Sequence, residues 1–173
     1  MNEVQEVKKP ATTLETVQQY FGQINVKSKF DEVLGEKAPQ FMTSVSNAIR
    51  GNASLQKCEA PSIIASALVA ATYDLPVDSN LGFAAIVPYG NKAQFQMMYK
   101  GFVQLAIRSG AYKNMHVSEV YEDEVEAYSP ITGELEFVKK IPAEGYRSKG
   151  DTSKIVGYYA TFTLLTGFKK ELY

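Results

Sequence analysis

The apolar residues of this chain change their spacing at Leu81, from the period of a helix to that of a strand. Before Leu81, apolar side chains recur every three or four residues, which is typical of amphipathic helices. After it, Phe83, Ala85, Val87 and Tyr89 alternate with Ala84, Ile86 and Pro88, which is the period of a strand. The pattern therefore predicts an α+β fold, with helices first and then antiparallel strands.

Four helices are predicted in the N-terminal half. Their starts are marked by Thr12, Ser28, Pro39 and Pro61. Thr12 and Glu15 match a capping box, and Pro suits the first turn of a helix. Gly51 is expected to end the third helix, and the fourth, over residues 62–73, is apolar nearly all round and is expected to be buried. Residues 1–11 read as a flexible tail.

The β-structure is predicted to open with a hairpin that turns at Gly90 and Asn91. Its second strand is expected to run to Tyr99, with Gln94, Gln96 and Lys100 on the face away from the core. A helix from Phe102 to Ser109 follows. Further strands are predicted over residues 115–128, around Leu135 to Ile141, over 154–166 and, after a turn at Thr166 and Gly167, at the end of the sequence; residues 142–151 read as a loop.

In the strand over residues 154–166, Val156, Tyr158, Ala160, Phe162 and Leu164 share one side, which predicts a half-buried strand. The predicted order of helices followed by β-β-α-β-β-β suggests one domain over residues 12–173. The sequence stops inside a returning strand, so we expect that more chain follows in the full gene product.

Composition excludes several classes of protein. The chain has 173 residues, of which 45% are hydrophobic, enough for one core. No apolar run approaches the roughly 18 residues of a membrane span, and the N-terminus does not resemble a signal peptide. We therefore expect a soluble cytoplasmic protein without a membrane partner.

Few residues are available for catalysis or metal binding. A single Cys, Cys58, rules out an internal disulfide and a multi-cysteine zinc site, and His116 is the only His. We expect both to be structural. The sequence has no glycine-rich phosphate-binding loop for ATP or NAD. No cofactor and no catalytic residue are predicted, and a binding protein is favoured.

Charge is unevenly distributed, although the net charge is only -1. The basic residues of segment 79–118 are Lys92, Lys100, Arg108 and Lys113, and this segment has no acid. One interpretation is a surface that meets a polyanion. The alternative is a half-buried apolar segment with little room for charge.

The following segment, 119–136, has the opposite charge and no base. Its acids are Glu119, Glu122, Asp123, Glu124, Glu126, Glu134 and Glu136. Three interpretations stay open: a solvated strand face, a contact with the basic segment of a neighbouring protomer, or a divalent-metal site.

Short motifs are spread over residues 79–110. They are Ser79-Asn80-Leu81-Gly82, Pro88-Tyr89-Gly90-Asn91-Lys92, Gln94, Tyr99-Lys100-Gly101, Leu105-Ala106 and Arg108-Ser109-Gly110. In these residues and their spacing the chain resembles the RecT family of phage single-strand annealing recombinases. Because the motifs are dispersed, the match is more specific than a lone glycine motif would be.

The resemblance implies an annealing protein that needs neither metal nor nucleotide. Such a protein oligomerises on single-stranded DNA as a ring or helical filament and pairs it with a complementary strand. Its core would be similar to that of the eukaryotic annealing ring proteins. The resemblance also implies a partner 5′-to-3′ exonuclease, a host single-strand DNA-binding protein, and a phage or prophage gene expressed in the bacterial cytoplasm. The family's basic C-terminal region is missing from this sequence, so we expect oligomerisation or DNA affinity to be incomplete.

Annealing requires a grip on the DNA backbone that leaves the base edges free. Lysine suits this task because it contacts phosphate as a point charge. We predict one positive groove wall, which consists of Lys92, Gln94, Gln96, Lys100, Arg108, Tyr112 and Lys113. The resemblance supports Lys92, Gln94, Tyr99, Lys100 and Arg108 by position, and the others rest on their predicted facing. Tyr89, beside the Gly90-Asn91 turn, is the candidate for a wedge between bases.

Plainer interpretations stay open for several of these residues. Asn91 and Lys92 could form only a turn, Tyr99 could be a core aromatic, and Arg108 could interact with the helix dipole. A second set could form the opposite groove wall or merely solvate a loop: Lys139, Lys140, Arg147, Lys149 and Lys154. For the whole protein, the alternatives to annealing are a metal-dependent nuclease and an oligomeric scaffold.

Overall fold

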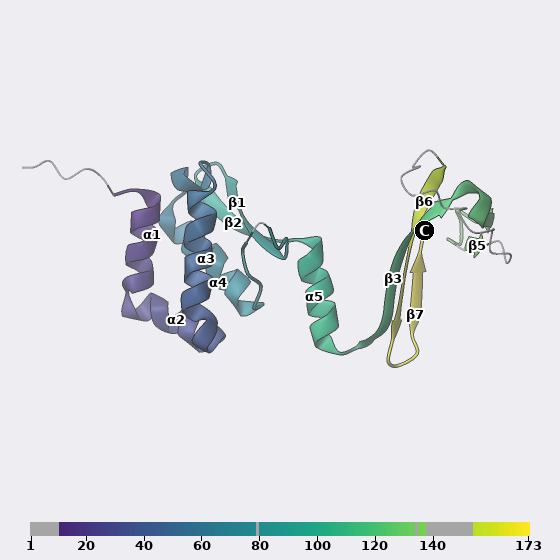
Figure 1. Ribbon diagram of the computed structural model, residues 1–173, viewed down its shortest axis with the longest axis horizontal. Helices are drawn as coiled ribbons and strands as arrows, with labels where there is room; N and C mark the ends of the chain where they lie inside the picture. The colour runs from purple at the N-terminus through teal and green to yellow at the C-terminus, as the bar shows by residue number, and fades with distance from the viewer. Residues whose placement is uncertain (1–10, 79, 134, 138–153) are drawn as a thin grey trace, which may run out of the picture. The chain divides into compact units, whose positions relative to one another are not determined.

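The computed structural model describes residues 11–78, 80–133, 135–137 and 154–173 (Figure 1). The chain divides into two compact units, residues 1–105 and 106–173, and each is described by itself. The predicted α+β class is confirmed, because helices come first and antiparallel strands follow. The expectation of a single domain over residues 12–173 stays a prediction, and the expected tail lies almost wholly outside the described residues.

The first unit begins with helices. They are α1 (Thr13–Gly22), α2 (Ile24–Leu34), the 3-10 turn η1 (Gly35–Lys37), α3 (Ala38–Arg50), the 3-10 turn η2 (Leu55–Lys57) and α4 (Ala60–Thr72). The capping box of α1 is confirmed: the Glu15 N–H donates to the Thr12 hydroxyl, and the Thr12 N–H donates to the Glu15 carboxylate. The Pro-marked starts of α3 and α4 and the end of α3 at Gly51 are also confirmed.

The predicted cap at Ser28 is wrong. Helix α2 already begins at Ile24, so Ser28 lies within it. The Ser28 hydroxyl donates to the Asn25 carbonyl at 3.2 Å, a bond inside the helix. Such a bond satisfies the hydroxyl without ending or starting the helix.

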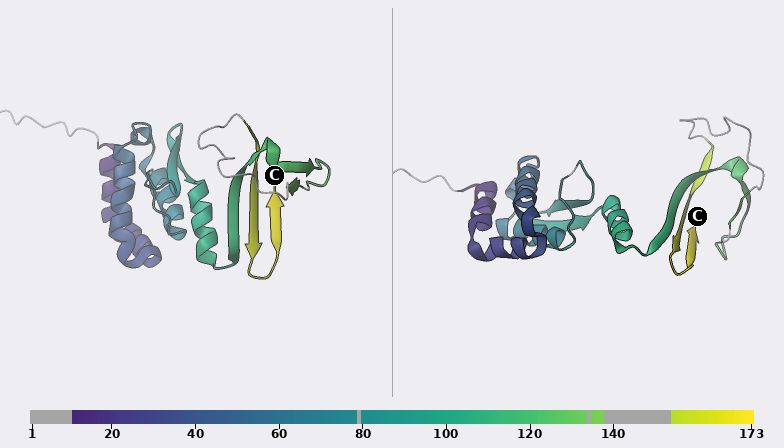
Figure 2. Two further views of the ribbon diagram at one scale, coloured as in Figure 1. Left: turned by 45° about the vertical axis from the view of Figure 1, so that its right-hand side comes forward. Right: turned by 60° about the horizontal axis from the view of Figure 1, so that its bottom comes forward.

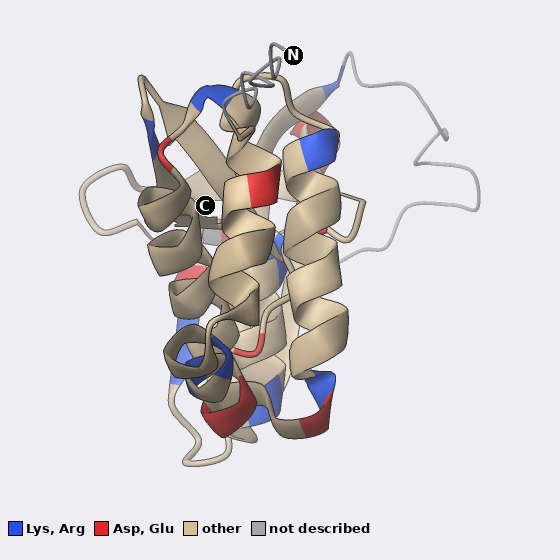
Figure 3. Cartoon of the chain, turned by 90° about the vertical axis from the view of Figure 1, so that its left-hand side faces the viewer, with Lys and Arg blue, Asp and Glu red and all other residues tan. Residues whose placement is uncertain are grey.

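The core of the first unit is centred on α4. Ile63, Ala67, Ala70 and Ala71 of this helix are fully buried among apolar side chains of the other helices. Because alanine is small, neighbouring elements can approach the helix closely. Figure 3 shows that much of the charge on the helical face of this unit lies toward the helix ends.

The β-structure of the first unit is a hairpin of β1 (Ala84–Tyr89) and β2 (Lys92–Met97). The strands pair antiparallel from Ala84 with Met97 to Tyr89 with Lys92, which confirms the predicted turn at Gly90 and Asn91. Pro88 lies on β1, and the other edge of β1 pairs with no described strand. Helix α5 (Tyr99–Ser109) follows the hairpin.

The second unit holds the remaining strands. They are β3 (Tyr112–Tyr121), β4 (Val125–Tyr128), β5 (Leu135–Phe137), β6 (Ile155–Leu164) and β7 (Lys169–Leu172), with the 3-10 turn η3 (Glu122–Glu124) between β3 and β4. Strands β3, β6 and β7 form one antiparallel sheet in that order, and β4 pairs with β5 (Figure 2). The single strand predicted over 115–128 is therefore two strands interrupted at η3. The loop predicted over 142–151 lies outside the described residues.

Residues of β4 and β5 pack on one face of the β3-β6-β7 sheet and not on the other. Tyr128 of β4 packs against Tyr173, and Phe137 of β5 packs against Tyr159, with ring centroids 4.9 and 5.1 Å apart. The strand over residues 154–166 was predicted to be half-buried, and on the opposite face Ala160, Phe162 and Leu164 are partly buried, whereas Val156 and Tyr158 are 51% and 65% exposed. Alternation locates a shared face, but it does not specify what covers that face.

Candidate nucleic-acid interface

The β1-β2 hairpin has one buried face and one exposed face. Residues opposite each other on antiparallel strands point to the same side. On the inner face Ala84, Ile86 and Ala93 are buried, and Phe95 stacks on Tyr73 at 5.8 Å.

The outer face combines two columns of side chains. Ala85, Val87 and Tyr89 of β1 lie opposite Gln96, Gln94 and Lys92 of β2. The three β2 residues are exposed, and so is Tyr89. An apolar column with an aromatic tip therefore lies beside a column of two amides and one ammonium group.

The second strand ends at Met97, before the predicted end at Tyr99. The Met98 N–H donates to the Phe83 carbonyl at 3.0 Å, and the Met98 carbonyl accepts from the Gly101 N–H at 2.9 Å. Met98 thus ends the hairpin and begins the first turn of α5. Lys100 therefore lies on α5 and not in the row with Gln94 and Gln96, where it was predicted. The lysine in that row is Lys92.

Tyr99 is 71% exposed at the start of α5, so its interpretation as a core aromatic is wrong. The next residues of this motif hold α5 against the hairpin. A Cβ on Gly101 would lie 2.2 Å from the Phe83 carbonyl oxygen, which only glycine permits. The stem of Lys100 lies near Gly82, whose Cβ would be 3.6 Å from Cδ of the lysine.

Hydrogen bonds fix the hairpin to α4. The Ala93 N–H donates to the Ser62 hydroxyl at 2.8 Å, and the Ser66 hydroxyl donates to the Ala93 carbonyl at 3.1 Å. Sequence reasoning missed both serines. The signal was present, because two hydroxyls four residues apart on a mostly apolar helix share one face.

A second contact holds the turn of the hairpin. The Glu59 N–H donates to the Asn91 carbonyl at 2.8 Å, and the Asn91 side-chain amide donates to the Glu59 carboxylate at 2.6 Å. Gly90 has a φ of 62°, which supports the tight turn. Asn91 therefore acts structurally here, while Tyr89 and Lys92 on either side of the turn are free of this contact.

The remaining predicted site residues fall at the end of α5 and in the second unit. Arg108 is in the last turn of α5, and Tyr112 and Lys113 begin β3. Because the hairpin and β3 belong to different units, a single groove wall stays a prediction. Lys154 precedes β6, and its carbonyl accepts from the Glu122 N–H at 3.1 Å. Lys139, Lys140, Arg147 and Lys149 lie outside the described residues.

Part of the acidic segment is used locally at the end of β3. The Tyr121 N–H donates to the Glu124 carboxylate at 3.0 Å, and the Tyr121 hydroxyl donates to Glu119 at 3.3 Å. Across the described ranges, no group of three or more His, Cys, Asp or Glu side chains could hold a metal ion. Burial, and then the charge of Glu59, raises the pKa of the Cys58 thiol, which favours its neutral form. His116 is exposed on β3.

Comparison with known proteins agrees with the motifs. Residues 39–173 match the RecT family, a range that includes the hairpin, α5 and every described strand. The chain belongs to the RecT family. It is also 45% identical over 149 residues to the uncharacterized protein YqaK of Bacillus subtilis (strain 168). That alignment covers 86% of this chain and 50% of YqaK, so the chain spans about half the length of this relative.

Proposed function

We propose that this chain binds single-stranded DNA along the outer face of the β1-β2 hairpin and accelerates the annealing of complementary strands. The observation that carries the proposal is the exposed column of Lys92, Gln94 and Gln96, held in place by α4 in a member of the RecT family. Binding is without base preference, and annealing uses neither ATP nor metal.

The chemistry of this face suits a DNA backbone. Lys92 supplies a point charge for phosphate, and the two glutamine amides supply neutral N–H donors. The neighbouring Val87 and Tyr89 offer apolar surface on which sugars or bases can rest. Among the described residues at the turn, Glu59 is acidic, but its carboxylate already accepts from Asn91.

We further propose that the chain oligomerises on DNA. Helix α5 supports this idea because Tyr99, Phe102, Val103 and Ile107 are 71%, 62%, 44% and 60% exposed. On a helical wheel these side chains share one face, and such an exposed apolar patch is typical of an interaction surface. A 5′-to-3′ exonuclease and a host single-strand DNA-binding protein are the proposed partners, in the bacterial cytoplasm. Among the described helices, none has both the length and the hydropathy of a membrane span.

The test mixes two complementary oligonucleotides with the chain, in EDTA and without ATP. We expect faster duplex formation, as measured by fluorescence quenching between labelled strands. Shortened strands after addition of Mg²⁺ would identify a nuclease instead. An absence of any DNA binding would favour an oligomeric scaffold and would overturn the proposal.

A variant pair assigns the binding to the hairpin. Lys92→Gln removes the ammonium group from the outer face, whereas Lys29→Gln removes an exposed ammonium group from α2. The plot of log affinity against log salt has a negative slope, and each lost phosphate contact makes this slope less steep by about 0.7 for a single strand. We expect this loss for Lys92→Gln only. Equal slopes for both variants would contradict the assignment.

A further inference from the structure

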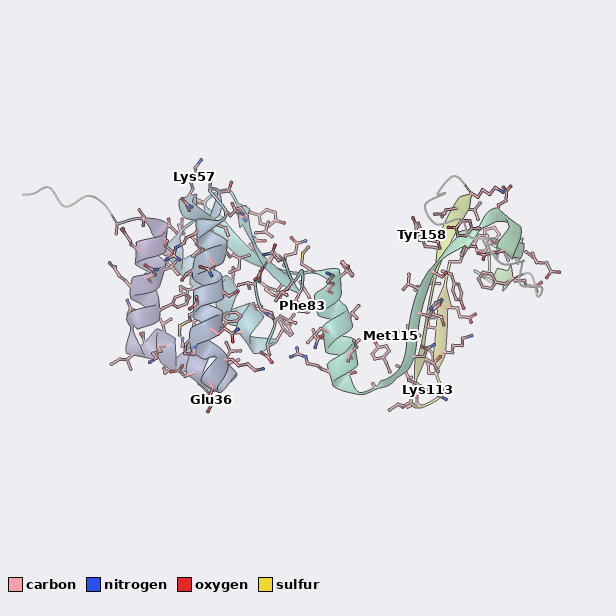
Figure 4. All side chains as sticks on the ribbon, in the orientation of Figure 1. Glu36, Lys57, Phe83, Lys113, Met115 and Tyr158 are labelled. Atoms are coloured by element: carbon pink, nitrogen blue, oxygen red, sulfur yellow. The ribbon has the colours of Figure 1, made fainter. Side chains whose placement is uncertain are left out.

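The β3-β6-β7 sheet has ends of opposite charge. At one end, Tyr112 pairs with Leu164, and the Leu165 N–H donates to the Ala111 carbonyl at 2.9 Å. The start of β3, with Lys113, therefore lies beside the turn between β6 and β7, which Lys169 and Lys170 follow. The other end carries Glu119, Glu122 and Glu124, with Lys154 as the described base beside them. Figure 4 labels Lys113 at the first end and Tyr158 toward the second.

The two lysines of β7 point to opposite faces of this sheet. Lys169 shares a row with Thr163 and Asn114, whereas Lys170 shares a row with Phe162 and Met115. Lys169 forms an ion pair with Glu171. Lys170 forms no ion pair with any described residue. Among the described residues, the cation on the Phe162 face is therefore without an ion-pair partner.

Lys170 lies opposite Phe162 on β6, and two further aromatic rings lie next to Phe162 at this end of the sheet. Phe162 is partly buried, and its ring lies 5.6 Å from that of Tyr112 and 6.2 Å from that of Phe168. Tyr112 and Phe168 are 36% and 56% exposed. Phe162 thus supports two outer rings that stay accessible.

The occupant that fits this combination is a single strand of nucleic acid. Lysines beside exposed aromatic rings bind it by neutralising phosphates while bases stack on the rings. The acid on the same face, Glu119, lies opposite Tyr158, four residues along β6 from Phe162 and hence about 13 Å away. The cationic end is therefore complementary in charge to a phosphate chain.

We propose that Tyr112, Lys113, Phe168 and Lys170, which we call the sheet tip, form a second contact for single-stranded DNA. Lys170 binds phosphate, and a base stacks on Phe168. The inference rests on the proposed function and extends it to the β6-β7 turn, which the sequence motifs do not include.

The adjacent lysines provide a matched test. Lys170→Gln and Lys169→Gln remove the same charge one residue apart, on opposite faces of β7. We expect Lys170→Gln to reduce the salt slope of single-strand binding by about 0.7 and Lys169→Gln to leave it unchanged. Fluorescence anisotropy with a labelled oligothymidine over a salt series measures both. Equal slopes for the two variants would overturn the sheet tip.

The aromatic part is tested with Phe168→Leu, which keeps apolar bulk but removes the ring. We expect affinity for oligothymidine to fall about fivefold or more, because base stacking on an aromatic ring contributes substantially to affinity. Leu165→Ala, in the same turn and 69% exposed, is the control and should change affinity less than about twofold. Similar losses for the two would contradict stacking on Phe168.

The outcomes separate this inference from the proposed function. If the wild-type chain binds and Lys92→Gln alone lowers the slope, the sheet tip is wrong and the hairpin assignment stands. If the wild-type chain binds no DNA, both fail. If Lys170→Gln lowers the mass measured by light scattering without DNA, the sheet tip is a protein contact and the inference is overturned.

Discussion

Gly101 joins two parts of the candidate interface through its lack of a side chain. Its neighbours Lys100 and Tyr99 follow the hairpin, and its Cα lies against the Phe83 carbonyl. This carbonyl also accepts the Met98 N–H that ends the hairpin. The motif Tyr99-Lys100-Gly101 therefore has a packing function at its third position, whatever its first two residues bind.

We predict that Gly101→Ala lowers the free energy of unfolding by about 2 kcal/mol, in the range of other overpacked sites. The added methyl group would meet backbone 2.2 Å away, and backbone cannot rotate aside as a flexible side chain can. Gly22→Ala, in α1 with nothing within 4 Å of its Cβ, is the control and should be neutral or slightly stabilising. Urea denaturation followed by circular dichroism measures both variants. Equal stabilities would contradict the close approach.

The ion pair on β7 predicts a dependence of stability on pH. The hydrogen bond from Lys169, and then that from the Tyr159 hydroxyl, lower the pKa of Glu171. A carboxyl whose pKa is lowered by folding stabilises the fold above its ordinary pKa, and this stabilisation is lost as the pH falls through the lowered value. The pKa of Lys169 is raised, chiefly by its hydrogen bond to Glu171, so its contribution is lost only at alkaline pH.

We therefore expect Lys169→Gln to destabilise the chain slightly at neutral pH and to make less difference at acidic pH, below the lowered pKa of Glu171. The effect is small because the pair is exposed and screened by solvent. Urea denaturation at pH 7 and at a series of decreasing acidic pH values tests it. A difference between wild type and variant that grows on acidification would show that the pair does not stabilise the fold.

At the scale of secondary-structure elements, the attachment of the hairpin to α4 is the contact on which the site depends. We predict that Ser62→Ala costs about 1–3 kcal/mol, because it leaves the Ala93 N–H without its acceptor. Thr72→Ala is the control, since its exposed hydroxyl only donates to the Leu68 carbonyl within α4. Thermal unfolding compares the two. A loss confined to Thr72→Ala would contradict the role of Ser62.

Much of the fold could be predicted from the spacing of apolar residues and from residues that cap helices or form turns. The capping box at Thr12, the prolines of α3 and α4, and the Gly90-Asn91 turn act locally, so the sequence alone reveals them. The start of α2 could not be predicted, because Gln23 makes no side-chain cap bond there. The interruption at η3 depends on the Glu124 carboxylate reaching back to the Tyr121 N–H, and a run of acids hides this contact.

The candidate site was predictable where it follows the pleat. Gln94 and Gln96 lie on the exposed face as alternation predicts, but Lys100 does not, because a tertiary hydrogen bond to Phe83 ends the strand. The sheet tip could not be predicted from the sequence, for a different reason. Tyr112 and Phe168 are distant in sequence, and only the β3-β6-β7 register brings them together.

At the scale of the whole molecule, each unit carries a candidate contact for DNA, and α5 carries an exposed apolar face. We predict that Phe102→Glu together with Ile107→Glu lowers the mass of protein–DNA complexes in light scattering, because charge on this face opposes docking of another protomer. Thermal unfolding should change little, since both side chains are exposed.

Gln104→Glu, elsewhere on the same helix, adds negative charge outside the apolar face and is the control. Complexes of unchanged mass in the Phe102 and Ile107 double variant would show that α5 does not mediate assembly.

Pro88 affects how the edge of β1 away from β2 could pair with a strand of another copy of the chain. Its partner across the hairpin, Ala93, turns its N–H away from β1 toward Ser62, so a residue at position 88 would turn its own N–H outward in the same way. Proline has no backbone N–H, so a strand that paired with this edge of β1 would lack one inter-strand hydrogen bond there. If several copies assemble side by side on one DNA molecule, as proposed, this missing donor disfavours pairing of their hairpins into a continuous β-sheet. Each hairpin would then contact the DNA independently.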